Sequence, residues 1–376
     1  MALIPSFPGV HFGYGALAEL AAELAGRGVA RPLLLTDAAL VRVGVVERVR
    51  AGLAPGRRAA LFDGIPENPT IAGVERALLA YREGACDGIV AVGGGSVLDS
   101  GKALRILAQQ GGRLIDYLHE PARIARTSIP LITIPTTAGT GAEVTFGGGI
   151  HPEPDTPALG IRSVHARPDL AICDPELTLT LPPRLTAATG MDALTHCVEG
   201  FLSTRDNPPG KAIALDGIAR VVRHLAPATA DGQDREARRE MLMAALEGGM
   251  SIWMGLGPMH ALSAAFGDAP LHHGTLVSVA MPAVMRYYSG LPGGALQRVA
   301  AAMGLAPDGD AGRRIADAVA QLNAELGLPA SVRAMGYDRT DVGRLVDAAF
   351  GSYFNQTAPR PPTRVDYERL VSAVLG

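Results

Sequence analysis

DGIVAVGGGSVLDSGKALRILAQQ, residues 87–110, is the stretch that decides the fold, because it changes from a strand pattern to a helix pattern across three glycines. Residues 87–96 form the short apolar run of a buried strand, and residues 97–110 have the i, i+3, i+4 spacing of a helix. The glycines let the backbone turn sharply, and the first N–H groups of the helix face any anion bound there. The stretch predicts a strand–turn–helix unit suited to phosphate, with a plain tight turn as the alternative.

The alternation of strand and helix patterns continues through the first half of the chain. Strand patterns cover residues 31–37, 59–65, 87–96, 129–137 and 169–175, with helix patterns such as 70–85 between them. After residue 176 only helix patterns remain, at 182–203, 210–226, 235–254 and 311–327. Strands alternating with helices predict a Rossmann-like parallel sheet. We therefore expect an α/β domain over residues 1–176 and an all-α domain over residues 177–376.

The composition favours a globular protein without a polyanionic partner. Hydrophobic residues make up 48% and charged residues 19%, and the net charge of -3 gives no argument for nucleic acid or an anionic membrane. The three cysteines lack CxxC spacing, which suits a reducing, cytoplasmic compartment, and the N-terminus lacks a signal-peptide pattern. The uncharged segment 249–267 contains Pro258 and His260, so we expect a buried helix there and no membrane span.

A second loop rich in threonine and glycine, IPTTAGTGAEVT at 134–145, follows another expected strand. Two such loops at strand ends of one open sheet are where a dinucleotide binds. Asp37 ends the first expected strand and is suited to accept ribose hydroxyls, although it is equally suited to cap the next helix. Ser96 and Asp99 likewise have the S-x-x-D spacing of a helix capping box.

The helical half contains a group of potential metal ligands. Asp192 and His196 are four residues apart on a helix pattern, so their side chains share one face. His260 lies in the uncharged segment, and His272 and His273 precede the next helix pattern. One carboxylate and three imidazoles would suit Fe²⁺ or Zn²⁺. The alternatives are a surface hydrogen bond for the first pair and satisfied core histidines for the others.

Four ordered motifs together resemble the iron-dependent (group III) alcohol dehydrogenase family over nearly the whole chain. They are GGGSVLDSGKA (93–103), PTTAGTGAEVT (135–145), ATGMDALTHCVEG (188–200) and MHALSAAFGDAPLHHG (259–274). The resemblance implies an N-terminal dinucleotide-binding α/β domain and an all-α C-terminal domain, an architecture also found in dehydroquinate synthases. It further implies that the ion is held by Asp192, His196, His260 and His273.

The resemblance also implies NAD as the cofactor. Its phosphates would contact Gly94, Gly95 and Ser96, and we expect the rest of the cofactor site at Asp37, Asn68, Asp99, Thr136, Thr137 and Thr140. The chain departs from the family at two positions. Ala264 stands where members often have a histidine near the nicotinamide, and Ala158 stands where a lysine usually contacts the cofactor, with Arg162 nearby.

The loss of a histidine at position 264 leaves the proton relay open. A histidine with a pKa near neutrality is a suitable proton carrier, and His272 adjoins the expected metal ligands. His272 is therefore our candidate catalytic residue. The alternative is a supporting or surface role without part in the chemistry.

We expect an NAD-dependent metalloenzyme that interconverts a small primary alcohol and its aldehyde, with Fe²⁺, or Zn²⁺ instead, acting as a Lewis acid. The paired histidines and their spacing from His260 resemble members that act on short ω-hydroxy acids such as 4-hydroxybutyrate. The alternatives are a maleylacetate reductase and a dehydroquinate synthase-like lyase that uses NAD without net redox. A non-catalytic binding protein is disfavoured because all four expected ligands are present. We also expect a homo-oligomer, a dimer or larger.

Overall fold

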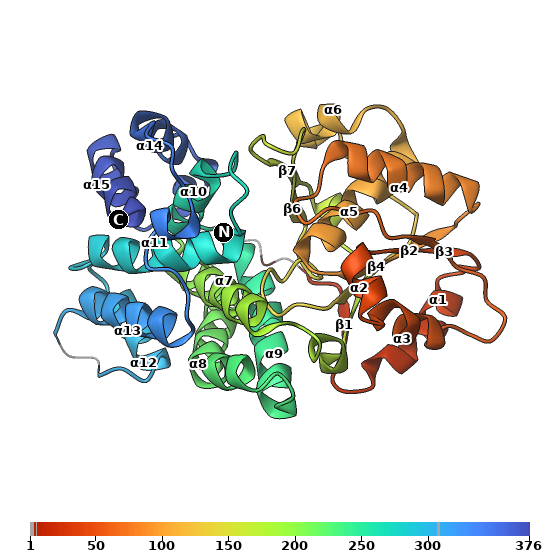
Figure 1. Cartoon of the computed structure of the whole chain (residues 1–376), viewed down its shortest axis with the longest axis horizontal. Coiled ribbons are helices and arrows are strands. Elements are labelled where there is room, and N and C mark those ends of the chain that lie inside the picture. Colours follow the sequence, from red (N-terminus) through yellow and green to blue (C-terminus); the bar gives the residue numbers. More distant parts are fainter. Residues whose placement is uncertain (1–3, 5, 307–308) are drawn as a thin grey trace. The chain divides into compact units, whose positions relative to one another are not determined.

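The structure, a computed structural model, describes residue 4 and residues 6–306 and 309–376, and it divides into two compact units (Figure 1). The α/β unit comprises residues Ser6–Thr137 and Ala142–Thr180, and the helical unit contains Ala138–Gly141 and Leu181–Gly376. The division that we expected after residue 176 lies inside the 3-10 helix η4 (Pro175–Thr178). Among the described residues, no helix is long and apolar enough to cross a membrane.

The α/β unit is built on a six-stranded sheet in the order β1-β8-β5-β4-β2-β3, and every pairing in it is parallel. The five predicted strands are confirmed. Two further elements were not predicted: the edge strand β1 and an antiparallel hairpin of β6 and β7. The strands are β1 (Gly9–Phe12), β2 (Pro32–Leu35), β3 (Ala60–Phe62), β4 (Gly88–Gly93), β5 (Leu131–Pro135), β6 (Gly147–Ile150), β7 (Leu159–Arg162) and β8 (Leu170–Cys173).

Helices cover both faces of this sheet, as the alternating patterns predict. The unit's α-helices are α1 (Leu20–Gly26), α2 (Ala38–Arg42), α3 (Val45–Ala51), α4 (Ile71–Glu83), α5 (Gly95–Gln110) and α6 (Leu114–His119). Its 3-10 helices, besides η4, are η1 (Ala16–Glu19), η2 (Pro121–Arg123) and η3 (Val164–Ala166).

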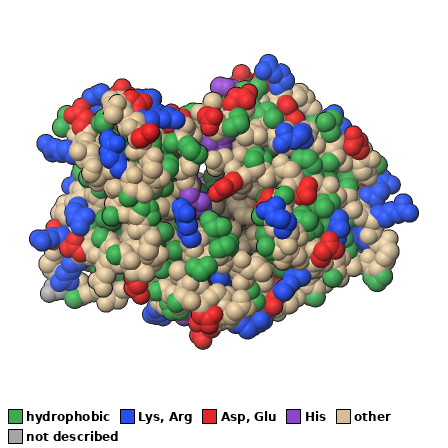
Figure 2. All heavy atoms as spheres, viewed as in Figure 1, with side chains coloured by type: hydrophobic (Ala, Val, Ile, Leu, Met, Phe, Trp, Pro, Cys, Tyr) green, Lys and Arg blue, Asp and Glu red, His purple; other side chains and the backbone are tan. Residues whose placement is uncertain are grey.

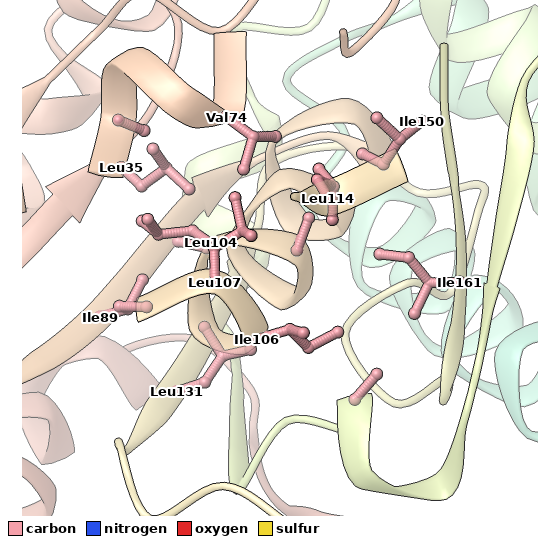
Figure 3. Close-up of a cluster of buried hydrophobic side chains, with 14 of the residues drawn as sticks. Leu35, Val74, Ile89, Leu104, Ile106, Leu107, Leu114, Leu131, Ile150 and Ile161 are labelled. Atoms are coloured by element: carbon pink, nitrogen blue, oxygen red, sulfur yellow. The ribbon is translucent and has the colours of Figure 1, made fainter. Parts of the chain in front are cut away.

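Successive side chains of each strand enter two different apolar layers. Leu35 of β2 packs with Val74 of α4 and Leu104 of α5 on one face (Figure 3). Leu34, the preceding residue, joins α1 and α3 on the opposite face through Val46 and its neighbours. Because side chains alternate along a strand, a strand that is apolar at every position must be covered on both sides. The continuous apolar runs of the sequence therefore fit a sheet between two helical layers.

A buried lysine ties the unpredicted hairpin to α5. Lys102 is fully buried, and its Nζ donates to Asp99 Oδ1 at 2.9 Å, Thr145 Oγ1 at 2.9 Å and the Gly147 carbonyl at 2.6 Å. The other carboxylate oxygen of Asp99 accepts from the Gly149 N–H at 3.0 Å. Each ammonium proton thus has an acceptor, which is the condition under which a buried charge is tolerated.

The helical unit is arranged around α7 (Pro183–Leu202), which is buried along almost its whole length and contacts α8, α9 and α11. No strand occurs among the described residues of this unit, as predicted. Its other α-helices are α8 (Pro208–Ala230), α9 (Arg235–Ile252), α10 (Pro258–Ala265), α11 (His273–Tyr287), α12 (Ala295–Ala302), α13 (Ala311–Glu325), α14 (Val342–Phe350) and α15 (Arg364–Leu375). The 3-10 helices are η5 (Arg333–Met335) and η6 (Tyr353–Thr357).

Residues 249–267, where we expected a buried helix, contain the end of one helix and the whole of a second, buried one. The helix α9 ends at Ile252, and α10 begins at Pro258. Between them Gly255 has φ of +99°, and a Cβ there would lie 2.1 Å from Thr357 Oγ1. Only glycine fits that backbone and that space. Pro258 then begins α10, where its missing N–H costs no hydrogen bond.

The Lys102 contacts lead to a prediction about stability. Lys102→Met keeps an unbranched side chain but leaves Asp99 without its ion pair and Thr145 and Gly147 without a donor. We expect the free energy of unfolding to fall by about 3 kcal/mol, the lower end for removing one partner of a buried pair. Urea unfolding followed by circular dichroism measures it.

The matched control is Lys211→Met, which removes an ammonium 6.0 Å from the centroid of the Phe201 ring. This change should cost about 1 kcal/mol or less. Equal losses of stability in the two variants would contradict the structural role of Lys102.

Candidate functional site

The strand order places a ligand-binding edge at the carboxyl ends of β2 and β4. From β2 the chain moves outward to β3, then returns across β2 to β4 and continues to β5 and β8. The order therefore reverses between β2 and β4, and ligands of open α/β sheets bind outside such a point. Asp37 follows β2, and Gly94 follows β4.

The glycine loop after β4 leaves the N-terminus of α5 free for a ligand. Gly94 is the N-cap residue, and no side chain among the described residues caps this helix. A Cβ on Gly94 would lie 3.2 Å from Thr137 Cγ2, so the loops after β4 and β5 pack closely here. Because the first N–H groups of a helix lack partners within it, this end can bind an anion.

The capping-box interpretation of Ser96 and Asp99 is wrong. The Ser96 hydroxyl donates to the Glu67 carbonyl, and the Asp99 carboxylate is bound to Lys102 and to Gly149. Both side chains tie α5 to neighbouring segments of its own unit. The N–H groups at the start of α5 are left without a side-chain acceptor.

The structure gives Asp37 the helix-capping role that was the alternative to ribose binding. Its Oδ1 accepts from the N–H groups of Ala39 at 2.8 Å and Leu40 at 3.0 Å, at the start of α2. Asn68 is exposed in the loop before α4. Capping does not occupy both carboxylate oxygens, since the two bonds end on the same oxygen.

The threonines predicted in the second loop lie in two different units. The Thr136 N–H donates to the Gly93 carbonyl at 3.1 Å, which joins the two loops at the sheet edge, and Thr137 packs on Gly94. Thr140 belongs to the short segment that is part of the helical unit. The predicted cofactor residues other than Thr140 are therefore all within the α/β unit.

Three histidine side chains in the helical unit converge on one carboxylate oxygen. Asp192 Oδ1 lies 3.5 Å from Nε2 of His196, 3.8 Å from Nε2 of His260 and 3.6 Å from Nε2 of His273. Ligand atoms of Asp192, His260 and His273 all lie within 4.8 Å of one another. The structure thus brings together residues that are as much as 81 positions apart in the sequence (273 − 192).

These distances fit a metal ion better than hydrogen bonds. Asp192 Oδ1 and His260 Nε2 are buried and have no hydrogen-bond partner among the described residues. Buried polar atoms without partners are costly and rare. Two ligands about 2.1 Å from one ion at a tetrahedral angle are about 3.4 Å apart. The observed spacing is close to that value, so the residues present can hold a divalent ion.

A carboxylate outside this group fixes the orientation of His260. Glu199 Oε2 lies 2.6 Å from His260 Nδ1, and Glu199 Oε1 accepts from the Met259 N–H at 2.7 Å. With the proton on Nδ1, the Nε2 of His260 carries the lone pair that a metal needs. The same carboxylate caps the N-terminus of α10, which no side chain of its own segment does.

The environment also sets the protonation of the donors. Burial lowers the pKa of His196 to about 4, which keeps its imidazole neutral. Burial would raise the pKa of Asp192, but the imidazoles of His196, His273 and His260 outweigh it and the pKa is lowered. Neutral imidazoles and an ionised carboxylate are the forms in which these groups bind a metal.

His273 differs from the other donors because 52% of its side-chain surface is exposed. Its Nδ1 lies 2.9 Å from the Ser263 hydroxyl of α10, which leaves Nε2 facing Asp192. His272 is the N-cap residue of α11, where its Nδ1 accepts from the Thr275 N–H at 3.4 Å.

Sequence analysis missed Glu199 and Ser263. A signal for Glu199 was present, because residues 192, 196 and 199 are spaced i, i+4, i+7 and share one face of α7. Nothing in the local sequence marks Ser263, since its role depends on the approach of the segment after α10.

The charged side chains outside the site are dispersed. Figure 2 shows Lys, Arg, Asp and Glu intermingled on the face in view, without a large patch of one sign.

Comparison with known proteins places the chain in a family. Residues 8–175 match the model of the iron-containing alcohol dehydrogenases, and residues 186–375 match the model of the C-terminal region of the Fe-containing alcohol dehydrogenase family. The chain is 43% identical to 4-hydroxybutyrate dehydrogenase of Cupriavidus necator over 99% of both chains.

Solved structures agree with this placement. A 1,3-propanediol oxidoreductase superposes with a TM-score of 0.93 at 31% identity, over 98% of each chain. Sulfoacetaldehyde reductase from Bifidobacterium kashiwanohense in complex with NAD+ has a TM-score of 0.91 at 25% identity, over 100% of this chain and 98% of that one. With both halves matched in order and a metal-ligand group in the second, this chain belongs to the iron-containing alcohol dehydrogenases, which are NAD-dependent oxidoreductases.

Proposed function

We propose that the protein oxidises a short ω-hydroxy acid, 4-hydroxybutyrate, to its aldehyde with NAD, and catalyses the reverse reduction. The observation that carries the proposal is the 43% identity to the Cupriavidus necator 4-hydroxybutyrate dehydrogenase over 99% of both chains. 4-Hydroxybutyrate is a small primary alcohol, the class that the motifs predict, with a carboxylate at its far end.

We propose Asp192, His196, His260 and His273 as the ligands of Fe²⁺, with Zn²⁺ as the alternative ion. The convergence of the three Nε2 atoms on Asp192 Oδ1 supports the set, and nitrogen and oxygen donors suit either ion. When bound, the metal supplies Lewis-acid polarisation of the alcohol oxygen, and NAD supplies the hydride acceptor.

The chain's own residues set the protonation and orientation of the metal-binding side chains and leave a route for the substrate. Glu199 orients His260 so that its Nε2 faces Asp192, and burial keeps His196 neutral, so His196 need not lose a proton when metal binds. The exposed side chain of His273 marks where the substrate reaches the centre.

We propose that the NAD phosphates bind at Gly94, Gly95 and Ser96, where the uncapped N-terminus of α5 supports an anion. Asp99, Thr136, Thr137, Thr140 and Asn68 complete the cofactor site in this proposal. Asp37 accepts the ribose hydroxyls through Oδ2, because its capping bonds use Oδ1 alone. A carboxylate here disfavours the extra phosphate of NADP.

We propose His272 as the proton relay. Its Nδ1 caps α11, and the residue adjoins the proposed ligand His273. The proposal also includes a cytoplasmic homo-oligomer, which light scattering after size-exclusion chromatography tests.

The substrate proposal predicts a preference for the carboxylate. kcat/KM for 4-hydroxybutyrate should exceed that for 1-butanol, which has the same chain length, by at least about tenfold, since a hydrogen bond to a charged group contributes about 1.5–3 kcal/mol. The increase in NADH absorbance measures both. An equal kcat/KM for 1-butanol would overturn the choice of substrate, and an absence of net NADH formation with any alcohol would point to a lyase.

The role of Glu199 predicts an effect on metal affinity. In Glu199→Gln the amide can still accept from the Met259 N–H, but its NH₂ group donates to His260 Nδ1 and moves the ring proton to Nε2. We expect Zn²⁺ affinity, measured by competition with a chelator, to fall about 10–100-fold. The control is Glu325→Gln, at the exposed end of α13. An unchanged affinity in Glu199→Gln would exclude His260 Nε2 as a ligand.

The relay role of His272 is separable from its capping role. Asparagine also caps helices, so His272→Asn removes the titratable ring and keeps the cap. We expect turnover to fall by about 10²-fold, with loss of the limb near neutrality in the pH–rate profile and no loss of metal. Turnover within about threefold of the parent, with an unchanged profile, would leave His272 with the capping role alone.

A further inference from the structure

The 3-10 helix η6 brings an aromatic pair next to the metal centre. It packs against α10, which carries His260. The ring of Phe354 lies 5.7 Å from that of His260 with a tilt of 53°, and the ring of Tyr353 lies 4.2 Å from that of Phe354. One face of His260 is stacked on His196 at 4.8 Å and 18°. Phe354 is therefore a direct neighbour of a proposed ligand without being a ligand itself.

The aromatic pair of η6 and the proposed ligand His273 are both partly exposed. Asp192 and His260 are buried, whereas 52% of the His273 side chain is exposed. His273 is tilted against His260 by 50°, close to the tilt of Phe354. Phe354 is half-buried, and Tyr353 is 45% exposed. Partly exposed rings thus lie beside His260, and His273 opens the same group of proposed ligands to solvent.

The C-terminal end of η6 is anchored to the segment between α9 and α10. The Thr357 hydroxyl donates to the Leu256 carbonyl at 2.8 Å, and the Thr357 carbonyl accepts from the Thr204 N–H at 2.9 Å. Gly255 permits this approach, because a Cβ there would lie 2.1 Å from Thr357 Oγ1. The contact at the turn between α9 and α10 therefore also positions η6.

The middle of η6 is anchored through the Asn355 side chain. Its amide nitrogen donates to the carbonyls of Ala349 at 2.9 Å and Phe350 at 3.2 Å, and its oxygen accepts from the Tyr367 hydroxyl at 2.5 Å. Tyr367 is fully buried in α15. A segment held at two points presents its side chains in a fixed orientation, as a specificity site requires.

We infer that η6 is the substrate-specificity element and that Phe354 is its determining residue. The Phe354 ring forms the wall against which the carbon chain next to the hydroxyl group packs, and it excludes bulky groups from that position. The residues of η6, YFNQT, carry no charge, so the wall selects by shape and apolar contact. The inference rests on the proposed function only in that the alcohol binds at the Asp192 centre.

The test compares a bulky and a slender primary alcohol in Phe354 variants. In Phe354→Ala, the ratio of kcat/KM for benzyl alcohol to that for 1-butanol should rise by about tenfold or more, the usual scale for a change in pocket size. Phe354→Leu should give a smaller rise, and this variant decides the matter if the alanine variant fails to fold by circular dichroism. The matched control is Phe350→Ala, which removes a 49% exposed phenylalanine at the end of α14.

A second measurement does not depend on turnover. In the Co²⁺-substituted protein without NAD, titration with benzyl alcohol should change the visible absorption at a concentration at least about tenfold lower in Phe354→Ala than in the parent. Metal content should be equal in both proteins if Phe354 only forms a wall of the substrate site. A lower metal content in Phe354→Ala would mean that the ring supports His260.

The two proposals fail in different ways. Suppose that the kcat/KM ratio of benzyl alcohol to 1-butanol rises in Phe354→Ala but the parent shows no preference for 4-hydroxybutyrate. That result would overturn the proposed substrate and support the role of Phe354. A ratio within about twofold of the parent in both Phe354 variants, or the same shift in Phe350→Ala, would overturn the role of Phe354 even if 4-hydroxybutyrate is the preferred substrate.

Discussion

The geometry of the metal centre depends on the two bonds of the Glu199 carboxylate. One oxygen caps the N-terminus of α10, and the other lies 2.6 Å from His260 Nδ1. A single side chain of α7 therefore sets both the start of α10 and the ring nitrogen that His260 turns toward Asp192. Because Asp192 and His196 belong to the same α7 helix, the carboxylate that orients one proposed ligand lies on the helix that carries two others. This arrangement joins local helix capping to metal binding.

In the α/β unit a different constraint applies. The loops after β4 and β5 approach each other closely, next to the point where the strand order reverses. Gly94 lacks the Cβ that would press on Thr137, and the N-terminus of α5 is left without a side-chain cap. Ser96 and Asp99 are bound to neighbouring segments instead, the latter through the buried Lys102. Packing and hydrogen bonds elsewhere thus leave this helix N-terminus, where we propose that the NAD phosphates bind, without a side-chain cap among the described residues.

Sequence patterns predicted the strands β2, β3, β4, β5 and β8 from their continuous apolar runs. They predicted the main helices from the i, i+3, i+4 spacing of apolar residues. They did not predict β1, whose sequence GVHF is not a continuous apolar run, or the hairpin, whose first strand is GGGI. Residues 249–267 contain no charged side chain, yet the chain turns between α9 and α10, where Gly255 leaves room for Thr357. That contact joins segments about a hundred positions apart, and no local pattern contains it.

The sequence by itself determined the two-part architecture, the family and the candidate ligands, since periodicity, glycine placement and motif order are local properties of the chain. Only the tertiary structure decided which side chains meet. It brought the Nε2 atoms of His196, His260 and His273 to one oxygen of Asp192, and it placed Phe354 beside His260. It also showed that Asp37 caps a helix, whereas the local sequence suited helix capping and ribose binding equally. Convergence of distant residues follows from helix packing, whose geometry depends on contacts across the whole unit and on no single segment.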